Sequence, residues 1–120
     1  MSDKLRVVLV DDQCLCRRGL SELLANSYDF DVLGATGSID ELRTMCLAEP
    51  DLLIVDLRMK PMDGISLVTQ LRSEGNTIPV VMLTMSDSDA DLASAIRAGV
   101  RGYLLKDMSP EDVVDSIRRV

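Results

Sequence analysis

Five short apolar runs recur along the chain, separated by segments with a different periodicity. The runs lie at residues 5–10, 30–35, 52–55, 80–83 and 103–105. They are mostly continuous and rich in Val, Ile and Leu, which is typical of strands that helices cover on both faces of a sheet. We therefore predict five buried parallel strands.

The segments between and after these runs predict five amphipathic helices, because their apolar residues recur with helical spacing. Ser38 with Glu41 forms a capping box, and Ser109 precedes a proline at the first position of the fifth helix. Gly75 and Gly99 stand where helix C-caps belong. This alternation predicts an α/β fold of the (βα)5 type. The apolar positions of the helices are Leu15, Leu20, Leu23 and Leu24; Ile39, Leu42, Met45 and Cys46; Ile65, Val68 and Leu71; Leu92, Ala93 and Ile96; and Val113, Val114 and Ile117.

Length, composition and charge narrow the class of protein. The chain has 120 residues, of which 47% are hydrophobic, enough for one domain with a core that needs no disulfide or structural metal. A net charge of −7 would repel a nucleic-acid backbone, so we expect no direct DNA or RNA binding by this segment. No stretch approaches the roughly 20 apolar residues of a membrane span. We expect a soluble, cytoplasmic protein with no membrane partner and no signal peptide.

Other features are interpreted more simply. Cys14, Cys16 and Cys46 lack paired metal-ligand spacing and are read as reduced, semi-buried thiols, with a redox or zinc role as the alternative. Arg17 and Arg18 are read as part of a solvated helix face. The chain ends inside the periodic pattern of the fifth helix, so we expect it to be part of a longer protein that carries an effector.

Polar residues follow four of the five predicted strands. They are Asp11 and Asp12, Asp56, Thr84, and Lys106. The carboxyl ends of parallel strands share one edge of a sheet, where ligands bind in open α/β folds. Three crowded carboxylates favour a divalent ion, and so few oxygen ligands favour Mg²⁺. A lysine and a hydroxyl suit phosphate oxygens, so the set is suited to receive a phosphoryl group.

Asp56 is the best candidate to accept that group. The chain has no histidine, which excludes a phosphohistidine and a histidine-based triad, and its serines lack an evident base. Asp56 stands alone after an interior strand, opposite the acid pair. Simpler interpretations are that Asp12 caps the first helix, Thr84 ends a strand, and Lys106 is solvated.

Four motifs now point to a family. They are Val-Asp-Asp at 10–12, Val-Asp-Leu-Arg-Met at 55–59, Met-Leu-Thr at 82–84 and Gly-Tyr-Leu-Leu-Lys-Asp at 102–107. Together they resemble the receiver domain of two-component response regulators, over essentially the whole chain. Residues 102–112 are similar to the nitrate-responsive subfamily, whose effector is a LuxR-type helix-turn-helix.

This resemblance implies a doubly wound, flavodoxin-like fold with strand order 2-1-3-4-5. Residues 1–120 would be the receiver, and a C-terminal DNA-binding effector would be absent from this chain. Asp56 would accept phosphate from a sensor histidine kinase, and Lys106 would pair with a phosphoryl oxygen. Mg²⁺ would be held by Asp11, Asp12, Asp56 and the backbone carbonyl of Arg58.

The resemblance also implies a switch with a transcriptional output. Thr84 would turn toward the phosphate and leave space that Tyr103 enters. The face formed by the fourth helix, fifth strand and fifth helix would then serve a homodimer or an effector contact. The domain would not be an enzyme beyond Mg²⁺-dependent self-phosphorylation and autodephosphorylation, and it would reach DNA only through the missing effector.

The chain departs from the family pattern at a few positions. Lys60 stands where a proline is usual and Pro61 follows it, Asp107 replaces the proline usual after the conserved lysine, and Met85 is larger than usual.

Other classes of protein fit less well. Asp11 and Asp12 would repel the phosphate of a flavodoxin cofactor, a cobalamin carrier needs a histidine ligand, and a haloacid-dehalogenase-like phosphatase needs an acid where Arg58 stands. The remaining alternative is a receiver-like interaction domain that works without phosphorylation.

Overall fold

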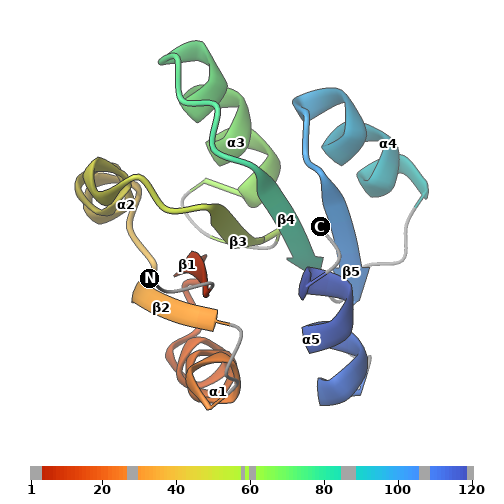
Figure 1. The fold of residues 1–120 in the computed structure, drawn as a ribbon. Helices are drawn as coiled ribbons and strands as arrows, with labels where there is room; N and C mark the ends of the chain where they lie inside the picture. Colours follow the sequence, from red (N-terminus) through yellow and green to blue (C-terminus); the bar gives the residue numbers. More distant parts are fainter. Residues whose placement is uncertain are drawn as a thin grey trace.

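A five-stranded parallel sheet forms the centre of the molecule, as seen in the computed structural model (Figure 1). The structure describes residues 4–26, 30–57, 59, 62–84, 89–105 and 109–118. Every neighbouring pair of strands is parallel, and their order is β2-β1-β3-β4-β5, which confirms the prediction. The strands are β1 (Leu5–Val10), β2 (Phe30–Thr36), β3 (Leu52–Asp56), β4 (Val80–Thr84) and β5 (Gly102–Leu105).

Five α-helices follow the strands in the described ranges, and most of their predicted ends are confirmed. Ser38 accepts a hydrogen bond from the amide of Glu41, while its own amide donates to the hydroxyl of Thr36. Gly75 and Gly99 have φ of 87° and 91°, a left-handed conformation that glycine adopts at little cost. A 3-10 turn, η1 (Cys46–Ala48), extends the second helix and was not predicted. The α-helices are α1 (Cys14–Ala25), α2 (Ile39–Met45), α3 (Gly64–Ser73), α4 (Asp89–Ala98) and α5 (Pro110–Arg118).

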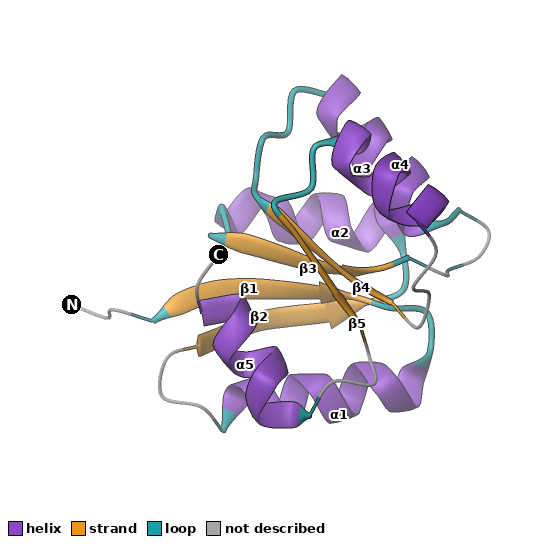
Figure 2. Ribbon diagram, turned by 90° about the vertical axis from the view of Figure 1, so that its right-hand side faces the viewer, coloured by secondary structure: helices purple, strands orange, loops and turns teal. Residues whose placement is uncertain are grey.

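The sheet separates two hydrophobic cores (Figure 2). Helices α1 and α5 cover one face, and α2, α3 and α4 cover the other. Because side chains alternate along a strand, Val81 and Leu83 of β4 pack on one face while Val80 and Met82 pack on the opposite face. The α1–α5 core comprises Val7, Leu9, Leu24, Phe30, Leu52, Ile54, Val81, Leu83, Val113 and Ile117. The α2–α4 core comprises Val8, Val10, Leu42, Leu53, Val55, Leu57, Met59, Leu67, Val68, Leu71, Val80 and Met82.

This double cover explains why the strands have continuous apolar sequences, since both faces are removed from water. Among the described residues, no helix is both long and apolar enough to cross a bilayer.

Candidate functional site at the carboxyl edge of the sheet

Buried polar side chains gather at one edge of the sheet. Within the described part of the chain they are Asp11, Thr36, Asp56 and Thr84. Thr36, Asp56 and Thr84 are the last residues of their strands, and Asp11 directly follows β1. Burial of polar groups is unfavourable unless they are well partnered, so their concentration at the carboxyl edge marks it as the candidate site.

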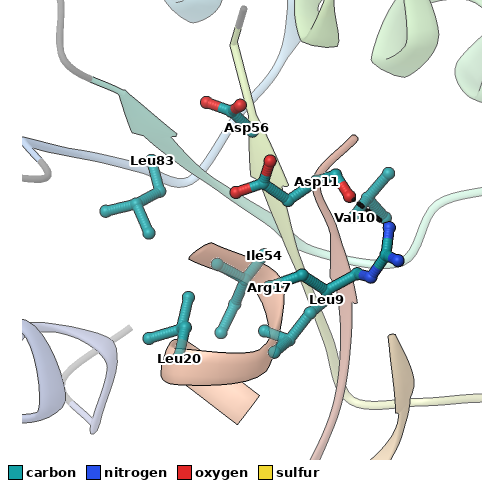
Figure 3. A pocket seen from close by; sticks show the side chains of 8 residues that line it. All are labelled: Leu9, Val10, Asp11, Arg17, Leu20, Ile54, Asp56 and Leu83. Atoms are coloured by element: carbon teal, nitrogen blue, oxygen red, sulfur yellow. Dashed lines mark hydrogen bonds between the residues drawn. The ribbon is translucent and has the colours of Figure 1, made fainter. Parts of the chain in front are cut away.

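Three carboxylates meet at this edge, as predicted. Asp11, Asp12 and Asp56 each place a carboxylate oxygen within 4.8 Å of the others. Asp11 and Asp56 are only 7% and 4% exposed, whereas Asp12 is exposed. Figure 3 shows the carboxylates of Asp11 and Asp56 close together beyond the ends of β1 and β3. Such crowding is unfavourable unless a cation offsets it, so this cluster can hold a hard metal ion.

The loop after β1 sets the position of the acid pair. The amide of Asp11 donates to the carbonyl of Thr36 at 2.9 Å, which ties the end of β1 to the end of β2. One carboxylate oxygen of Asp11 accepts the amide of Gln13, also at 2.9 Å. Gln13 is the N-cap of α1 and its side chain makes no capping hydrogen bond. The N-cap position thus belongs to Gln13, and Asp12 belongs to the acidic cluster.

Asp56 is held at the end of a fully buried strand. It is paired with Leu83 of β4 in the sheet register. The amide of Gly64, the first residue of α3, donates to the carbonyl of Leu57 at 2.8 Å. A Cβ at position 64 would lie 2.3 Å from the Asp56 carbonyl oxygen, so α3 approaches β3 this closely only with glycine there. The backbone of Asp56 is thus fixed from two sides.

Thr84 and Tyr103 lie on the same side of the sheet. Thr84 is completely buried and follows Met82 by two residues, which places both on the face of the α2–α4 core. Tyr103 pairs with Met82 in register and packs, partly buried, against the same core. The hydroxyl at the end of β4 and the aromatic ring on β5 are therefore on neighbouring strands and a common face.

Comparison with known proteins settles the family. The model of the response regulator receiver domain matches residues 7–118. The chain belongs to the response regulator receiver domain family.

Individual relatives agree with this assignment. The chain is 39% identical to a nitrate/nitrite response regulator protein homolog of Haemophilus influenzae, over 100% of this chain and 58% of that protein. It is 38% identical to the nitrate/nitrite response regulator protein NarP of Escherichia coli, over 94% and 53%. It superposes on a two-component response regulator of the LuxR family from Aurantimonas sp. SI85-9A1 with a TM-score of 0.88 and 25% identity, over 97% and 84%.

These relatives confirm the resemblance to nitrate-responsive and LuxR-type regulators that the motifs predicted. This receiver domain spans about half the length of the curated relatives it matches.

Several predicted positions of the receiver domain lie outside the described residues. These are Arg58, Lys106, Lys60, Pro61, Met85 and Asp107. For Cys14 and Cys16 the structure describes the backbone only, so the prediction for these thiols is not tested.

Cys46 is a free, partly buried thiol, as predicted. Burial raises the pKa of this thiol, against a weaker opposite effect of a hydrogen bond with Asn76, and the thiol therefore stays protonated and unreactive near neutral pH.

Arg17 is the residue of this receiver domain that sequence reasoning misread. It is partly buried, and its Nη1 donates to the backbone carbonyl of Asp11 at 2.8 Å, whereas Arg18 is exposed as expected. A signal was present in the sequence, because Leu20 and Leu24 follow Arg17 by three and seven residues and so share its helix face. Because Arg17 is charged, it was assigned to the solvated face of the helix although its spacing places it beside the apolar residues.

Proposed function

We propose that this receiver domain accepts a phosphoryl group on Asp56 in a Mg²⁺-dependent reaction, with a sensor histidine kinase as the donor. The observation that carries the proposal is the convergence of Asp11, Asp12 and Asp56 within 4.8 Å at the carboxyl edge of the sheet. The alternative, an interaction domain that works without phosphorylation, is not favoured, because it leaves the crowding of three carboxylates without a purpose.

The donor set fits Mg²⁺. Carboxylate oxygens are hard ligands, and a site with few of them leaves positions for water and phosphate oxygens, as Mg²⁺ requires. Asp11, Asp12 and Asp56 would hold the ion together with the backbone carbonyl of Arg58. The bound ion would neutralise charge that builds up between the phosphoryl oxygens and the attacking carboxylate.

The side chains of this chain would carry out the transfer itself. A carboxylate oxygen of Asp56 forms the new bond to phosphorus while the bond from phosphorus to the donor's imidazole nitrogen breaks, and that nitrogen keeps the electron pair. The ammonium of Lys106 would pair with one phosphoryl oxygen and the hydroxyl of Thr84 would donate to another. The product is an acyl phosphate on Asp56, and the domain otherwise catalyses no reaction beyond its own phosphorylation and dephosphorylation.

Phosphorylation would act by shifting a conformational equilibrium. A ligand favours the conformation that it binds better, and Thr84 contacts the phosphate only when its hydroxyl turns toward it. Tyr103 would then move on the same face of the sheet. The outer face of α4 supports an output there, since Leu92 and Ile96 are 38% and 62% exposed. We propose the α4–β5–α5 face as the surface for a homodimer or an effector contact.

The output would be transcriptional. The curated relatives are roughly twice as long as this chain, and we propose that a C-terminal helix-turn-helix effector accompanies this receiver in the cytoplasm. The net charge of −7 makes the receiver itself a poor partner for DNA, so DNA contact would belong to the effector alone.

Acetyl phosphate and intact-protein mass spectrometry test the proposed function. With Mg²⁺ the protein is expected to gain the mass of one phosphoryl group, and with EDTA it is expected to gain none. Hydroxylamine should remove the adduct, because it cleaves acyl phosphates but leaves phosphoserine and phosphothreonine intact. An unchanged mass in Mg²⁺, or an adduct that resists hydroxylamine, would refute phosphorylation on a carboxylate.

An Asp12→Asn protein is expected to be more stable than the wild type without metal and to lose its response to Mg²⁺. Neutralising one of three crowded carboxylates should raise the free energy of unfolding by about 1 kcal/mol in EDTA, because like-charge repulsion falls. Thermal denaturation in EDTA and in Mg²⁺ measures both effects. Asp31→Asn, at an exposed acid near the opposite end of the sheet, controls for the change in net charge and should keep the Mg²⁺ response. A lower melting temperature of Asp12→Asn in EDTA would contradict the expectation.

A further inference from the structure

Arg17 is bonded to the peptide group that joins two of the three clustered acids. Its Nη1 donates to the Asp11 carbonyl oxygen at 2.8 Å, and Figure 3 shows the guanidinium turned away from the carboxylates toward that oxygen. This carbonyl belongs to the peptide between Asp11 and Asp12. Its direction therefore determines where the Asp12 side chain starts relative to that of Asp11.

Gly37, in the turn after β2, lies beside both the guanidinium and this peptide. A Cβ at Gly37 would lie 3.0 Å from Nη1 of Arg17, 3.1 Å from Cα of Asp12 and 3.3 Å from the Asp11 carbonyl oxygen. The guanidinium and the peptide thus pack closely against a residue without a side chain, and a Cβ there would require one of them to shift. Arg17 from α1 and Gly37 from the turn after β2 together restrict how the peptide can rotate.

The stem of Arg17 is partly buried beside the acids. It lines a small cavity with Leu20, Ile54 and Leu83, and the carboxylates of Asp11 and Asp56 close the same cavity (Figure 3). The planar guanidinium is preorganised for its hydrogen bond to the Asp11 carbonyl, unlike the flexible ammonium of a lysine.

We propose that Arg17 is a positioning residue for the metal-binding acids, acting through the Asp11 carbonyl and assisted by Gly37. The inference rests on the proposed function, since it assigns Arg17 to the Mg²⁺ site of that same reaction. Removing a group that hydrogen-bonds to a metal ligand and orients it typically lowers the metal affinity by about 10–100-fold. Arg17 touches neither the ion nor the phosphoryl group, so its loss should weaken Mg²⁺ binding without altering the chemistry of the loaded site.

The matched pair Arg17→Met and Arg18→Met tests this inference. Methionine keeps an apolar stem and removes the guanidinium, and Arg18 is the exposed neighbour on the same helix. Calorimetric titration with Mg²⁺ should give a dissociation constant about tenfold higher for Arg17→Met and unchanged for Arg18→Met. Gly37→Ala, whose new Cβ would crowd both the guanidinium and the Asp11–Asp12 peptide, should also raise the constant and serves as the second variant if Arg17→Met fails to fold.

Phosphorylation rates at a series of Mg²⁺ concentrations separate positioning from a direct role. For Arg17→Met the Mg²⁺ concentration at half-maximal rate with acetyl phosphate should rise about tenfold, with the rate at saturation equal to that of the wild type. Equal Mg²⁺ affinity in Arg17→Met and Arg18→Met, or a reduced rate at saturation, would overturn the role of Arg17 alone. A wild-type protein that binds no Mg²⁺ would instead overturn the proposed function.

Discussion

An Asp56→Asn protein is expected to fold normally and to take up no phosphate from acetyl phosphate. Asparagine has nearly the same shape as aspartate, but its amide lacks the nucleophilic carboxylate oxygen that forms the acyl phosphate. Asp56 is 4% exposed and its backbone belongs to β3, so the strand pairing does not depend on the side-chain charge. Intact-protein mass spectrometry in Mg²⁺ should show complete loss of the phosphoryl adduct.

Asp51→Asn is the matched control for this experiment. Asp51 stands just before the other end of the same strand, where its carboxylate accepts the amide of Arg6, and asparagine keeps an acceptor oxygen there. This variant should be phosphorylated like the wild type. An adduct that persists in Asp56→Asn would show that another residue accepts the phosphate, and circular dichroism verifies that both variants are folded.

The second large effect is expected at Gly64, where alanine should lower the free energy of unfolding by about 2–4 kcal/mol. The new Cβ would lie 2.3 Å from the Asp56 carbonyl oxygen and 3.0 Å from Sδ of Met82. Met82 is a flexible neighbour, but the carbonyl is backbone at the end of the central strand and cannot yield without moving Asp56. Urea denaturation measures the stability, and the phosphorylation rate should fall with it because the acceptor is displaced.

Gly19→Ala is the matched control for Gly64→Ala, because the same substitution should here raise the free energy of unfolding. Gly19 lies on the exposed side of α1, and a Cβ there would meet nothing within 4 Å. Alanine should therefore stabilise the protein by about 0.5–1 kcal/mol, since glycine is unfavourable inside a helix. If both variants shifted stability by similar amounts in the same direction, the close approach at Gly64 would not be the cause.

Much of the fold was predictable because its determinants are local. Buried parallel strands need apolar residues on both faces, so they stand out as continuous runs. Three of the observed strands are one residue longer than the predicted runs at 30–35, 52–55 and 80–83, because each includes the polar residue that follows the run. Gly75 and Gly99 were recognisable because few other residues adopt a positive φ at low cost. The meeting of Asp11, Asp12 and Asp56 followed from the shared edge of parallel strands.

What sequence reasoning missed depends on hydrogen bonds from side chains to the backbone. Glu49 has a φ of 53° although it is not glycine, and the guanidinium of Arg6 holds this turn by donating to the carbonyls of Ala48 and Glu49. Arg17 was misassigned for a similar reason, because its acceptor is a backbone carbonyl that no residue pattern reveals. In both cases the guanidinium of an arginine donates to backbone carbonyls.

The position of β5 at the edge of the sheet has a mechanical consequence. Within the residues that the structure describes, β5 pairs with β4 only, so it is restrained along one side of the sheet. Tyr103 packs toward the helices α2–α4, whereas Leu104, the next residue, packs toward α1 and α5. A small displacement of this edge strand would therefore move side chains in both hydrophobic cores and so affect the helices on both faces of the sheet.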